Sequence, residues 1–326
     1  MFKGPMLRVG IIGTGVMGGH HTRVASMMPG FQLVGIYDAN LARAEEVAQQ
    51  YGVEAFASQQ ALCDAVEAVI IATPTVTHAE VATACLQAGV HVLLEKPIAA
   101  SLAEAEALAD LSARTDRVLL IGHVERFNPA VTALLPLLHN QELFACELQR
   151  LSTSMGRDRS ADIIFDLMIH DLDLALAFTG SNVVAVNAMG HRIRSGLIDH
   201  VTALLRFESG ITATLTASGV SQERIRQARL YTQNAQFTVN FASREVSIHR
   251  HGKSSIAQEN GQYYVTSQVE QILVPNREPL VIEQEHFLHA IRDGIKPLID
   301  AQAGLQALRL AYTIQERVKE QLSITA

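Results

Sequence analysis

The stretch "LRVGIIGTGVMGGHHTRVASMMPGFQLVGIYD" (residues 7–38) decides the fold of the N-terminal part of the chain. A continuous apolar run leads into the glycine-rich sequence GTGVMG (13–18), a helical pattern follows, and a second apolar run ends at Asp38. A G-x-G-x-x-G sequence alone is weak evidence. Here it lies between a predicted strand and a predicted helix, with an acidic residue 20 positions after Gly18. This context predicts a dinucleotide-binding unit.

Each position of the fingerprint has a physical role. Gly13 permits the tight turn, Gly15 lets the backbone approach a pyrophosphate, and Gly18 lets the helix pack on the strand. The pyrophosphate is expected at the helix N-terminus, where Val16 and Met17 complete the cofactor-binding loop.

The residue after the second strand indicates which dinucleotide binds. Asp38 can accept hydrogen bonds from the adenosine ribose hydroxyls. The next two residues, Ala39 and Asn40, offer no arginine for a 2′-phosphate. The sequence therefore predicts NAD as the cofactor rather than NADP.

Outward from this stretch, strands and helices alternate as far as residue 122. Alternation of this kind predicts a doubly wound parallel sheet, a Rossmann domain over residues 1–122. The predicted strands are 7–13, 31–38, 68–73, 90–95 and 117–122, and the predicted helices are 15–28, 41–52, 77–88 and 101–114.

The pattern changes over residues 123–326, which form the second predicted domain. A helix over 162–178 is followed by consecutive strands and then by helices over 282–293 and 301–321. Short turns such as "FESGIT" (207–212) predict antiparallel pairing. We therefore expect an α+β domain with an open, mostly antiparallel sheet. The predicted strands are 183–194, 200–208, 211–219, 226–233, 235–241, 244–250 and 262–274.

Bulk composition excludes several classes of protein. The 326 residues are 48% hydrophobic and 18% charged, as in a well-packed protein, and the net charge of −7 argues against nucleic acid as a partner. No apolar run is long enough to span a bilayer, and no metal-ligand spacing is present. The three cysteines are scattered, which favours free thiols in a reducing compartment, and we expect a cytoplasmic protein.

The apolar segment "ADIIFDLMIHDLDLALAF" (161–178) contains charged residues that need an explanation. In a helix, Asp166, His170 and Asp173 would fall within about 60° of one another. One interpretation is a half-exposed helix face with Asp162 as its N-terminal cap. The other is an acid–base pair at the wall of a cleft.

A second motif favours the acid–base pair. The sequence "ATPTVTHAEVATACLQAGVHVLLEKPIAASLAEAEAL" (72–108), with "GHVERFNPA" (122–130) and Asp-x-x-x-His at 166–170, resembles the glucose–fructose oxidoreductase, inositol dehydrogenase and MocA-type oxidoreductases. The resemblance covers the whole chain. It implies a catalytic group of Lys96, Asp166 and His170, and a cis peptide before Pro97. It also implies cofactor contacts from Thr73, Pro74, His78, Glu95 and Lys96.

The implied chemistry is oxidation of a secondary alcohol, with hydride transfer to nicotinamide. His170 is a suitable base because an imidazole titrates near neutrality, and Asp166 would orient it. Lys96 would hydrogen-bond the substrate oxygen. The sequence leaves open whether Lys96 or His170 takes the proton.

The flanking sequences "GHVERFNPAV", "DLMIHDLDLAL" and "LTASGVS" resemble a narrower subgroup, which oxidises the sugar 3-hydroxyl of UDP-N-acetylglucosamine. In that subgroup an aminotransferase converts the 3-keto sugar into a precursor of amide-linked lipid A. Arg157 and Arg159 are the cations expected to bind the diphosphate, with Lys96 and His170 at the sugar. Arg150 is a third local cation in the same stretch before the helix, and the weaker candidates for the diphosphate are Arg192, Arg194, Arg224 and Arg226.

Three alternatives remain open from the sequence. They are a dehydrogenase of a free polyol or sugar such as an inositol, a non-catalytic NAD-binding regulator, and a reductase of a non-sugar substrate such as a tetrapyrrole. The joint presence of the three catalytic residue types argues against the regulator. An open sheet with an apolar outer face would need covering, so we expect a homodimer or homotetramer.

Overall fold

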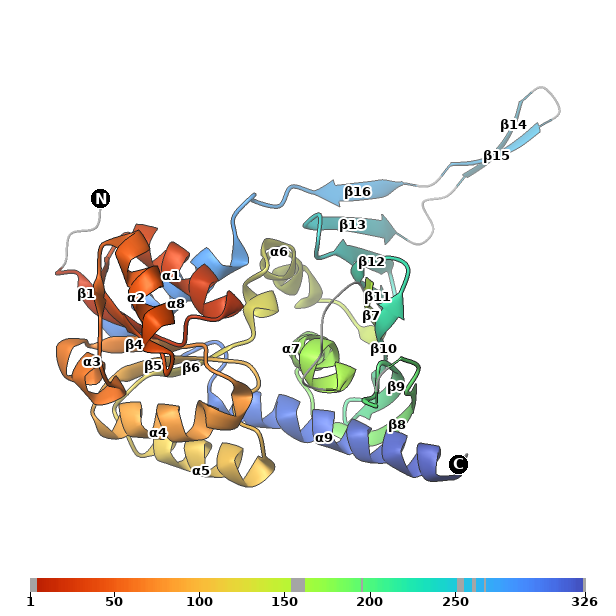
Figure 1. Ribbon diagram of the computed structural model, residues 1–326. Helices are drawn as coiled ribbons and strands as arrows, with labels where there is room; N and C mark the ends of the chain where they lie inside the picture. Colours follow the sequence, from red (N-terminus) through yellow and green to blue (C-terminus); the bar gives the residue numbers. More distant parts are fainter. Residues whose placement is uncertain are drawn as a thin grey trace. The chain divides into compact units, whose positions relative to one another are not determined.

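The computed structural model describes residues 5–153, 162–194, 196–250, 255–259, 262–266 and 268–324. The chain forms two compact units (Figure 1). The N-terminal unit comprises Met1–Val124 and Glu278–Leu308, and the C-terminal unit comprises Glu125–Arg277 and Arg309–Ala326. The chain first passes from the N-terminal to the C-terminal unit after Val124, close to the boundary expected after residue 122. The second predicted domain, 123–326, differs from the C-terminal unit because residues 278–308 return to the N-terminal unit.

The N-terminal unit contains a six-stranded parallel sheet of order β3-β2-β1-β4-β5-β6. The strand order reverses between β1 and β4, and in such sheets ligands bind beyond the carboxyl ends of the strands at this point. The strands are β1 (Leu7–Ile12), β2 (Phe31–Tyr37), β3 (Glu54–Ala55), β4 (Ala68–Ile71), β5 (His91–Glu95) and β6 (Leu119–Gly122).

Helices α2, α3 and α5 of the N-terminal unit begin where the sequence supplies a side-chain cap. Asn40 caps α2 and Ser58 caps α3, while Ser101 and Glu104 form a reciprocal capping box on α5. Helix α8 packs beside α1, which explains the return of the chain to this unit. The helices are α1 (Val16–Met27), α2 (Leu41–Tyr51), α3 (Gln59–Ala65), η1 (Thr75–Thr77), α4 (His78–Gln87), α5 (Leu102–Ala113) and α8 (Pro279–Arg292). Strand β3 and helix α3 were not predicted, because two and seven residues are too short to show a periodic pattern.

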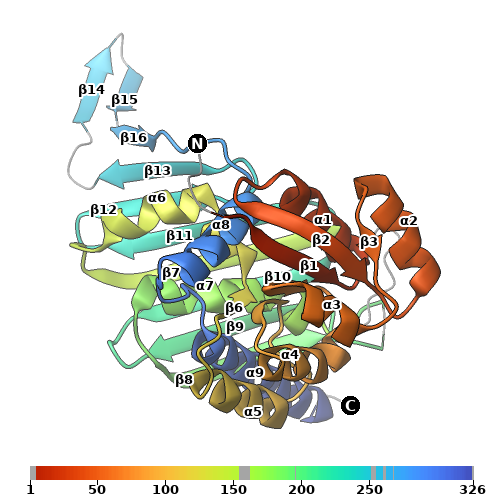
Figure 2. The same ribbon diagram turned by 90° about the vertical axis from the view of Figure 1, so that its left-hand side faces the viewer.

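The C-terminal unit contains an eight-stranded sheet of order β16-β13-β12-β11-β7-β10-β9-β8 and a separate pair, β14-β15 (Figure 2). The strands are β7 (Leu143–Thr153), β8 (Val183–His191), β9 (His200–Phe207), β10 (Thr212–Ser221), β11 (Ile225–Thr232), β12 (Ala235–Asn240), β13 (Glu245–Arg250), β14 (Ser255–Glu259), β15 (Gln262–Thr266) and β16 (Val269–Ile272). The β9–β10 hairpin is confirmed, with Gly210 at φ 89° in its turn.

The centre of this sheet differs from the antiparallel expectation. Strand β7, which the sequence pattern did not predict, inserts between β10 and β11 and pairs with β10 in parallel. Other pairs in this sheet are antiparallel. The sheet is therefore mostly antiparallel, as expected, with one parallel pair at its core.

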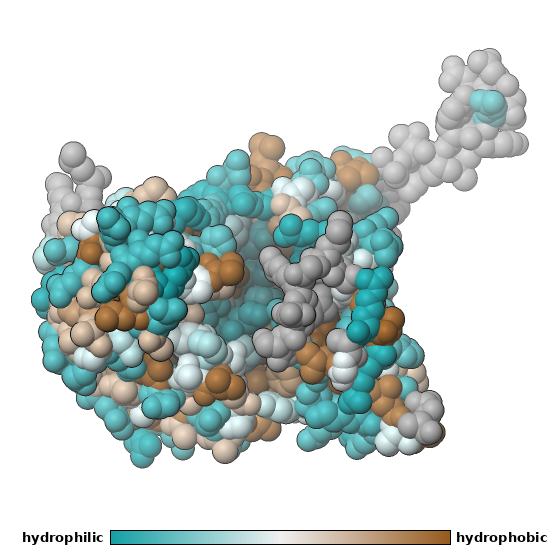
Figure 3. Space-filling model, viewed as in Figure 1, coloured by the Kyte–Doolittle hydropathy of each residue, from teal (hydrophilic) through white to brown (hydrophobic). Residues whose placement is uncertain are grey.

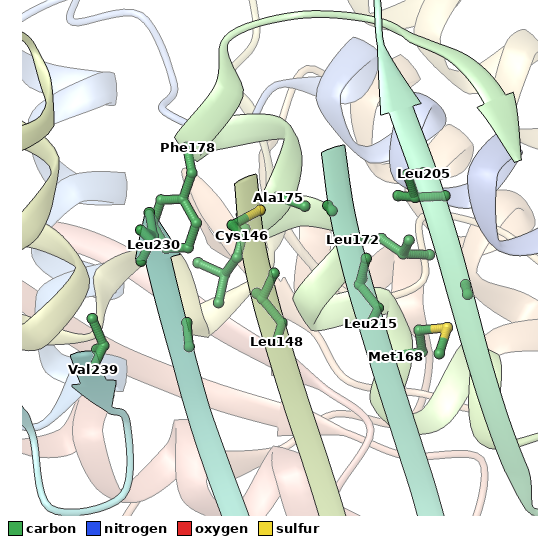
Figure 4. Packing of buried hydrophobic residues seen from close by; sticks show 14 of the residues in the cluster. Cys146, Leu148, Met168, Leu172, Ala175, Phe178, Leu205, Leu215, Leu230 and Val239 are labelled. Atoms are coloured by element: carbon green, nitrogen blue, oxygen red, sulfur yellow. The ribbon is translucent and has the colours of Figure 1, made fainter. Parts of the chain in front are cut away.

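One face of the sheet packs against helices, and Figure 4 shows the packing in detail. Met168, Leu172, Ala175 and Phe178 extend from α7 and the turn before it toward buried residues of the central strands. These helices are α6 (Pro129–Leu138), η3 (Ile164–Met168), α7 (Ile169–Thr179) and α9 (Ala301–Ile324), and the short helix η2 (Val124–Phe127) precedes α6. Helix α9 begins in the N-terminal unit and ends in the C-terminal unit. Among the described helices, none has the length and apolarity to cross a membrane.

The opposite face of the sheet is more polar than the sequence analysis expected. Register partners on this face are Gln149 with Gln227, Thr202 with Thr216, and Glu147 with Arg229, and each pair is joined by its side chains. The expected apolar outer face is therefore wrong for these central strands. On the side of the molecule that Figure 3 shows, hydrophobic residues of the N-terminal unit are scattered among hydrophilic ones.

Candidate active site

The glycine-rich loop has the geometry that a dinucleotide requires. Gly13 has a φ of 91°, and a Cβ there would lie 2.7 Å from the carbonyl oxygen of Ala72. A Cβ at Gly18 would lie 1.9 Å from the carbonyl oxygen of Gly13. These two glycines therefore close the turn and seat α1 against it.

Gly15 differs from these two because it is exposed and a Cβ there would meet nothing within 4 Å. Val16 and Met17, the first two residues of α1, are also exposed. Their N–H groups belong to the first turn of a helix, whose amides lack intrahelical partners. The loop thus leaves open space in front of a helix N-terminus, which fits the pyrophosphate of NAD.

The carboxylate of Asp38 is held in place at the carboxyl end of β2. Oδ2 accepts hydrogen bonds from the N–H and hydroxyl of Thr14 at 2.7 and 2.8 Å, and Oδ1 accepts one from the N–H of Asn40 at 2.8 Å. Burial alone would raise the pKa of Asp38, but these bonds and the charge of Arg43 lower it below its ordinary value. The ionised carboxylate keeps lone pairs for the two hydroxyls of a ribose.

The end of β5 carries Glu95, Lys96 and Pro97, and the Lys96–Pro97 peptide is cis, as expected. Glu95 is buried, and its Oε1 lies 2.8 Å from Nε2 of His21 on α1. Its Oε2 accepts a hydrogen bond of 3.2 Å from the backbone N–H of Lys96. Glu95 therefore shapes the backbone that presents Lys96.

His78 joins the ends of two strands. Its Nδ1 lies 2.7 Å from the carbonyl oxygen of Pro97, and its Nε2 lies 2.9 Å from that of Thr73. Burial lowers the pKa of His78, although both contacts oppose the shift. Since both ring nitrogens face backbone carbonyls, His78 braces the Thr73–Pro74 and Lys96–Pro97 segments, and its contact with the cofactor stays a prediction.

In the C-terminal unit, Asp166 and His170 lie on a helix that is irregular at this point. The N–H of Ile169 reaches back to the carbonyl of Ile164, so η3 is one π-helical turn leading into α7. Such turns often occur at functional sites. Both Asp166 and His170 are partly accessible, whereas Met168 and Ile169 between them are fully buried. Asp166 and His170 are thus the polar groups that this buried helix presents.

Asp162 does not cap this helix with its side chain, as one interpretation expected. Its Oδ1 accepts a hydrogen bond of 2.9 Å from the N–H of Ile198, and its Oδ2 accepts one from the side chain of Gln315. Asp162 instead ties the start of the helix to the loop before β9 and to α9.

The other two aspartates of the helix form buried ion pairs. Asp171 accepts hydrogen bonds of 2.9 and 2.6 Å from Nε and Nη2 of Arg150, whose Nη1 donates to Glu125 at 3.0 Å. Asp173 accepts one of 3.2 Å from Arg126. The side chains of Arg150 and Asp171 are 3% and 2% exposed. Arg150 is therefore a structural cation, which removes it as a candidate for the diphosphate.

Burial raises the pKa of both aspartates, although the charge of Arg150 opposes the shift at Asp171. It raises the pKa of Asp173 to about 7, because the charge and single hydrogen bond of Arg126 only partly oppose the loss of hydration. Asp173 thus departs from the single stripe that the helical spacing predicted. Asp166 and His170 remain accessible, while Asp173 belongs to the packed interior.

Arg157 and Arg159, the cations expected at the diphosphate, lie outside the described residues. Arg226 is described, and its guanidinium donates to the carbonyl of Leu151 and to Oγ of Ser152. Lys96 lies in the N-terminal unit, and Asp166 and His170 lie in the C-terminal unit. The convergence of these three catalytic candidates stays a prediction.

Comparison with protein families agrees with this geometry. Residues 7–123 match the oxidoreductase family with an NAD-binding Rossmann fold, and residues 148–238 match the GFO/IDH/MocA C-terminal domain. The chain belongs to the GFO/IDH/MocA oxidoreductase family. Its cofactor is NAD. The open glycine-rich loop fits the pyrophosphate of NAD, and the Asp38 carboxylate fits its adenosine ribose.

Relatives of the family resemble the chain over nearly its whole length. It is 35% identical to a UDP-N-acetylglucosamine 3-dehydrogenase from Acidithiobacillus ferrooxidans, over 96% of this chain and 97% of the relative. A solved structure of that enzyme matches with a TM-score of 0.89 and 34% identity over 97% of this chain and 98% of that one. A myo-inositol 2-dehydrogenase from Thermotoga maritima is 25% identical over 98% of both chains.

Several residues that organise the site were missed by the sequence analysis. His21 lies three positions after Gly18 and contacts Glu95, and Gln284 on α8 contacts His21. Glu125 and Arg126, quoted as part of a motif, were given no role. Charged or polar residues inside otherwise apolar helical faces were the available signal, but the partners are up to 263 residues apart in the chain.

Proposed function

We propose that this oxidoreductase uses NAD to oxidise the sugar 3-hydroxyl of UDP-N-acetylglucosamine to the 3-keto sugar nucleotide. The observation that carries the proposal is the match to the Acidithiobacillus ferrooxidans 3-dehydrogenase, at 35% identity over 96% of the chain. That match includes both units, and therefore both the cofactor loop and the helix of Asp166 and His170.

When bound at the glycine-rich loop, NAD would supply the hydride acceptor for oxidation of the carbinol carbon. His170 takes the hydroxyl proton on an imidazole nitrogen, Asp166 orients the ring, and the Lys96 ammonium hydrogen-bonds the substrate oxygen. In the alternative mechanism a deprotonated Lys96 is the base. The pH dependence of kcat distinguishes the two mechanisms, because imidazole and amine groups titrate in different pH ranges.

The position of the substrate follows from the same proposal. Arg157 and Arg159 bind the diphosphate, because paired guanidinium–phosphate contacts are strong and the sugar alone is small and well hydrated. The 3-keto product then passes to an aminotransferase that makes the 3-amino sugar for amide-linked lipid A.

We also propose that the protein forms a homodimer or homotetramer. The polar outer face of the C-terminal sheet implies that hydrogen bonds and ion pairs would contribute to any subunit contact on that face.

The test is a coupled assay with NAD and a panel of UDP-N-acetylglucosamine, UDP-N-acetylgalactosamine, UDP-glucose, free N-acetylglucosamine and myo-inositol. Mass spectrometry should show loss of two hydrogens from UDP-N-acetylglucosamine, and a sugar-nucleotide 3-aminotransferase with glutamate should trap the ketone. NADP in place of NAD is the cofactor control. Oxidation of myo-inositol without reaction of any UDP-sugar would overturn the proposal and favour a polyol dehydrogenase.

The pH dependence of kcat assigns the base. With His170 as base, activity should rise through the range near pH 6–7 and reach a plateau. A rise that continues toward pH 9–10 would assign the proton to Lys96.

A further inference from the structure

Behind Lys96 lies a buried polar cluster that the reaction does not account for. It consists of Glu95 on β5, His21 on α1, and Glu283 and Gln284 on α8. All four residues are buried, and His21, Glu283 and Gln284 are fully so. Two carboxyl groups in such a place need an explanation, because an ionised carboxylate without partners is costly to bury.

The hydrogen bonds of Gln284 define the tautomer of His21. The Gln284 side-chain NH2 lies 3.2 Å from the backbone carbonyl of His21 and 3.1 Å from its Nδ1. A carbonyl can only accept, so this end of the amide is the donor, and Nδ1 must accept as well. The proton of the neutral ring is therefore on Nε2, where it is donated to Glu95 at 2.8 Å.

Glu95 thus receives two neutral donors, Nε2–H of His21 and the N–H of Lys96. Each of its two carboxyl oxygens accepts one of these hydrogen bonds. Space for this arrangement comes from Gly122, since a Cβ there would lie 3.2 Å from Cα and 3.5 Å from Cδ of Glu95.

Glu283 is in the opposite situation. Neither of its carboxyl oxygens has a hydrogen-bond partner among the described residues. Burial and the charge of Glu95 raise the pKa of Glu283 well above its ordinary value. Glu95 on β5 is the charge that acts on it, and the neighbouring titratable group on α1, His21, is neutral in the tautomer derived above. A buried carboxyl without partners, next to a second carboxyl, favours its protonated form.

We propose that His21 is a positioning residue that acts through Glu95 on Lys96, and that Glu283 beside it is a neutral acid. His21 holds the Glu95 carboxylate against the backbone of Lys96, and Glu283 remains protonated, so that the pocket carries a single negative charge. This role rests on the proposed function only in that Lys96 touches the substrate; the charge state of the pocket does not depend on the substrate.

The first test replaces Glu283 by glutamine, the neutral isostere of a protonated acid. Kcat and KM of Glu283→Gln should stay within about twofold of wild type at pH 7. Its melting temperature should exceed that of wild type by roughly 2–4 °C at pH 8. The sign follows from linkage. When the pKa of a carboxyl is higher in the folded than in the unfolded state, its contribution to stability is complete below the unfolded-state pKa. The contribution is lost as pH rises through the folded-state pKa. Glutamine does not titrate, so the variant keeps its stability at pH 8.

Glu285→Gln is the matched control, because it makes the same change at a partly accessible position of the same helix. The difference in melting temperature between Glu285→Gln and wild type should not grow with pH. If Glu283 worked as an ionised carboxylate, Glu283→Gln would lose kcat tenfold or more with no gain in stability at pH 8, and the proposal would be wrong.

The second test separates positioning from packing at His21. The amide nitrogen of glutamine can take the place of Nε2 and donate to Glu95, whereas leucine cannot. His21→Leu should lower kcat tenfold or more while the Kd for NAD changes less than threefold, and His21→Gln should restore most of the kcat. Equal losses in the two variants, or a kcat within twofold of wild type in His21→Leu, would contradict the positioning role.

A readout without substrate keeps this result distinct from the substrate assignment. Nitrogen-15 NMR of labelled histidine, with His21→Gln to assign the signal, should show a neutral Nε2–H ring at pH 7.5. An imidazolium signal would overturn the assigned hydrogen bonds even if the enzyme oxidised no UDP-sugar. Normal NMR and stability results with no sugar-nucleotide oxidation would instead reject the proposed function alone.

Discussion

Two carboxylates of the N-terminal unit and two of the C-terminal unit are held by different kinds of group. In the N-terminal unit, Asp38 and Glu95 accept hydrogen bonds from neutral groups, namely backbone N–H, a hydroxyl and an imidazole. In the C-terminal unit, Asp171 and Asp173 meet the guanidinium groups of Arg150 and Arg126. A carboxylate held by neutral donors keeps its negative charge for a ligand or a nearby lysine. One paired with arginine is neutralised and serves the fold.

This difference separates the aspartates of one helix into two classes. Asp171 and Asp173 lie within seven residues of Asp166, yet they are buried in ion pairs while Asp166 is accessible. Residue type and spacing did not distinguish them. The arginine partners of Asp171 and Asp173, which come from distant parts of the sequence, distinguish them from Asp166.

The largest expected effect tests whether catalysis belongs to the accessible groups. Lys96→Met and His170→Ala should each lower kcat by about 10²–10⁴, the range of general acid–base and electrostatic contributions. NAD affinity should change little, because the phosphates and adenosine bind elsewhere. Steady-state kinetics with a fluorescence titration of NAD gives both quantities. Arg229→Met, on the outer sheet face, is the control, and a His170→Ala enzyme with most of its wild-type kcat would remove His170 from the mechanism.

Removing Arg150 should cause the largest loss of stability. Arg150→Met leaves Asp171 buried without its cation, at a cost of about 3–5 kcal/mol in the free energy of unfolding. The exposed pair Arg229–Glu147, 3.7 Å apart, is the matched comparison, and Arg229→Met should cost less than about 1 kcal/mol. Urea denaturation measures both. Equal costs would mean that burial does not distinguish the two arginines.

The pH dependence of stability tests the ionisation state of Asp173 in its pair with Arg126. The pKa of Asp173 is raised to about 7, so its contribution to stability is complete below the ordinary aspartate pKa and is lost as pH rises through about 7. Asparagine does not titrate. The stability of Asp173→Asn relative to wild type should therefore increase between pH 4 and 7, by on the order of 1–3 kcal/mol, and stay constant above. Thermal unfolding across this range measures it, and a difference independent of pH would show that Asp173 is ionised throughout.

The smallest effect concerns cofactor choice. Asp38→Ala should weaken NAD binding by about tenfold, the value of a charge-assisted hydrogen bond to ribose, and reduce the preference for NAD over NADP. Glu45→Ala, an exposed change on α2, should leave both affinities unchanged. Calorimetric titration with each cofactor gives the ratio. A wild-type enzyme that bound NADP as tightly as NAD would contradict the role of Asp38.

Much of the N-terminal unit could be predicted because its signals are local. The turn at Gly13, the packing at Gly18 and the caps at Asn40 and Ser101 each depend on residues within a few positions. Strand β7 could not be predicted in the same way. Its residues "LFACELQRLST" alternate imperfectly, and its place between β10 and β11 depends on segments more than 50 residues later.

The sequence by itself determined the Rossmann unit, the NAD fingerprint and the family, because short-range sterics and strand–helix periodicity are encoded in adjacent residues. Only the tertiary structure decided which charged residues are structural. Arg150 was a candidate for the diphosphate until its guanidinium was found between Asp171 and Glu125. His21 and Glu283 carried no signal until α8 packed beside α1. The reason is that hydration is lost only on burial, and the partner that replaces water comes from wherever the chain happens to pack.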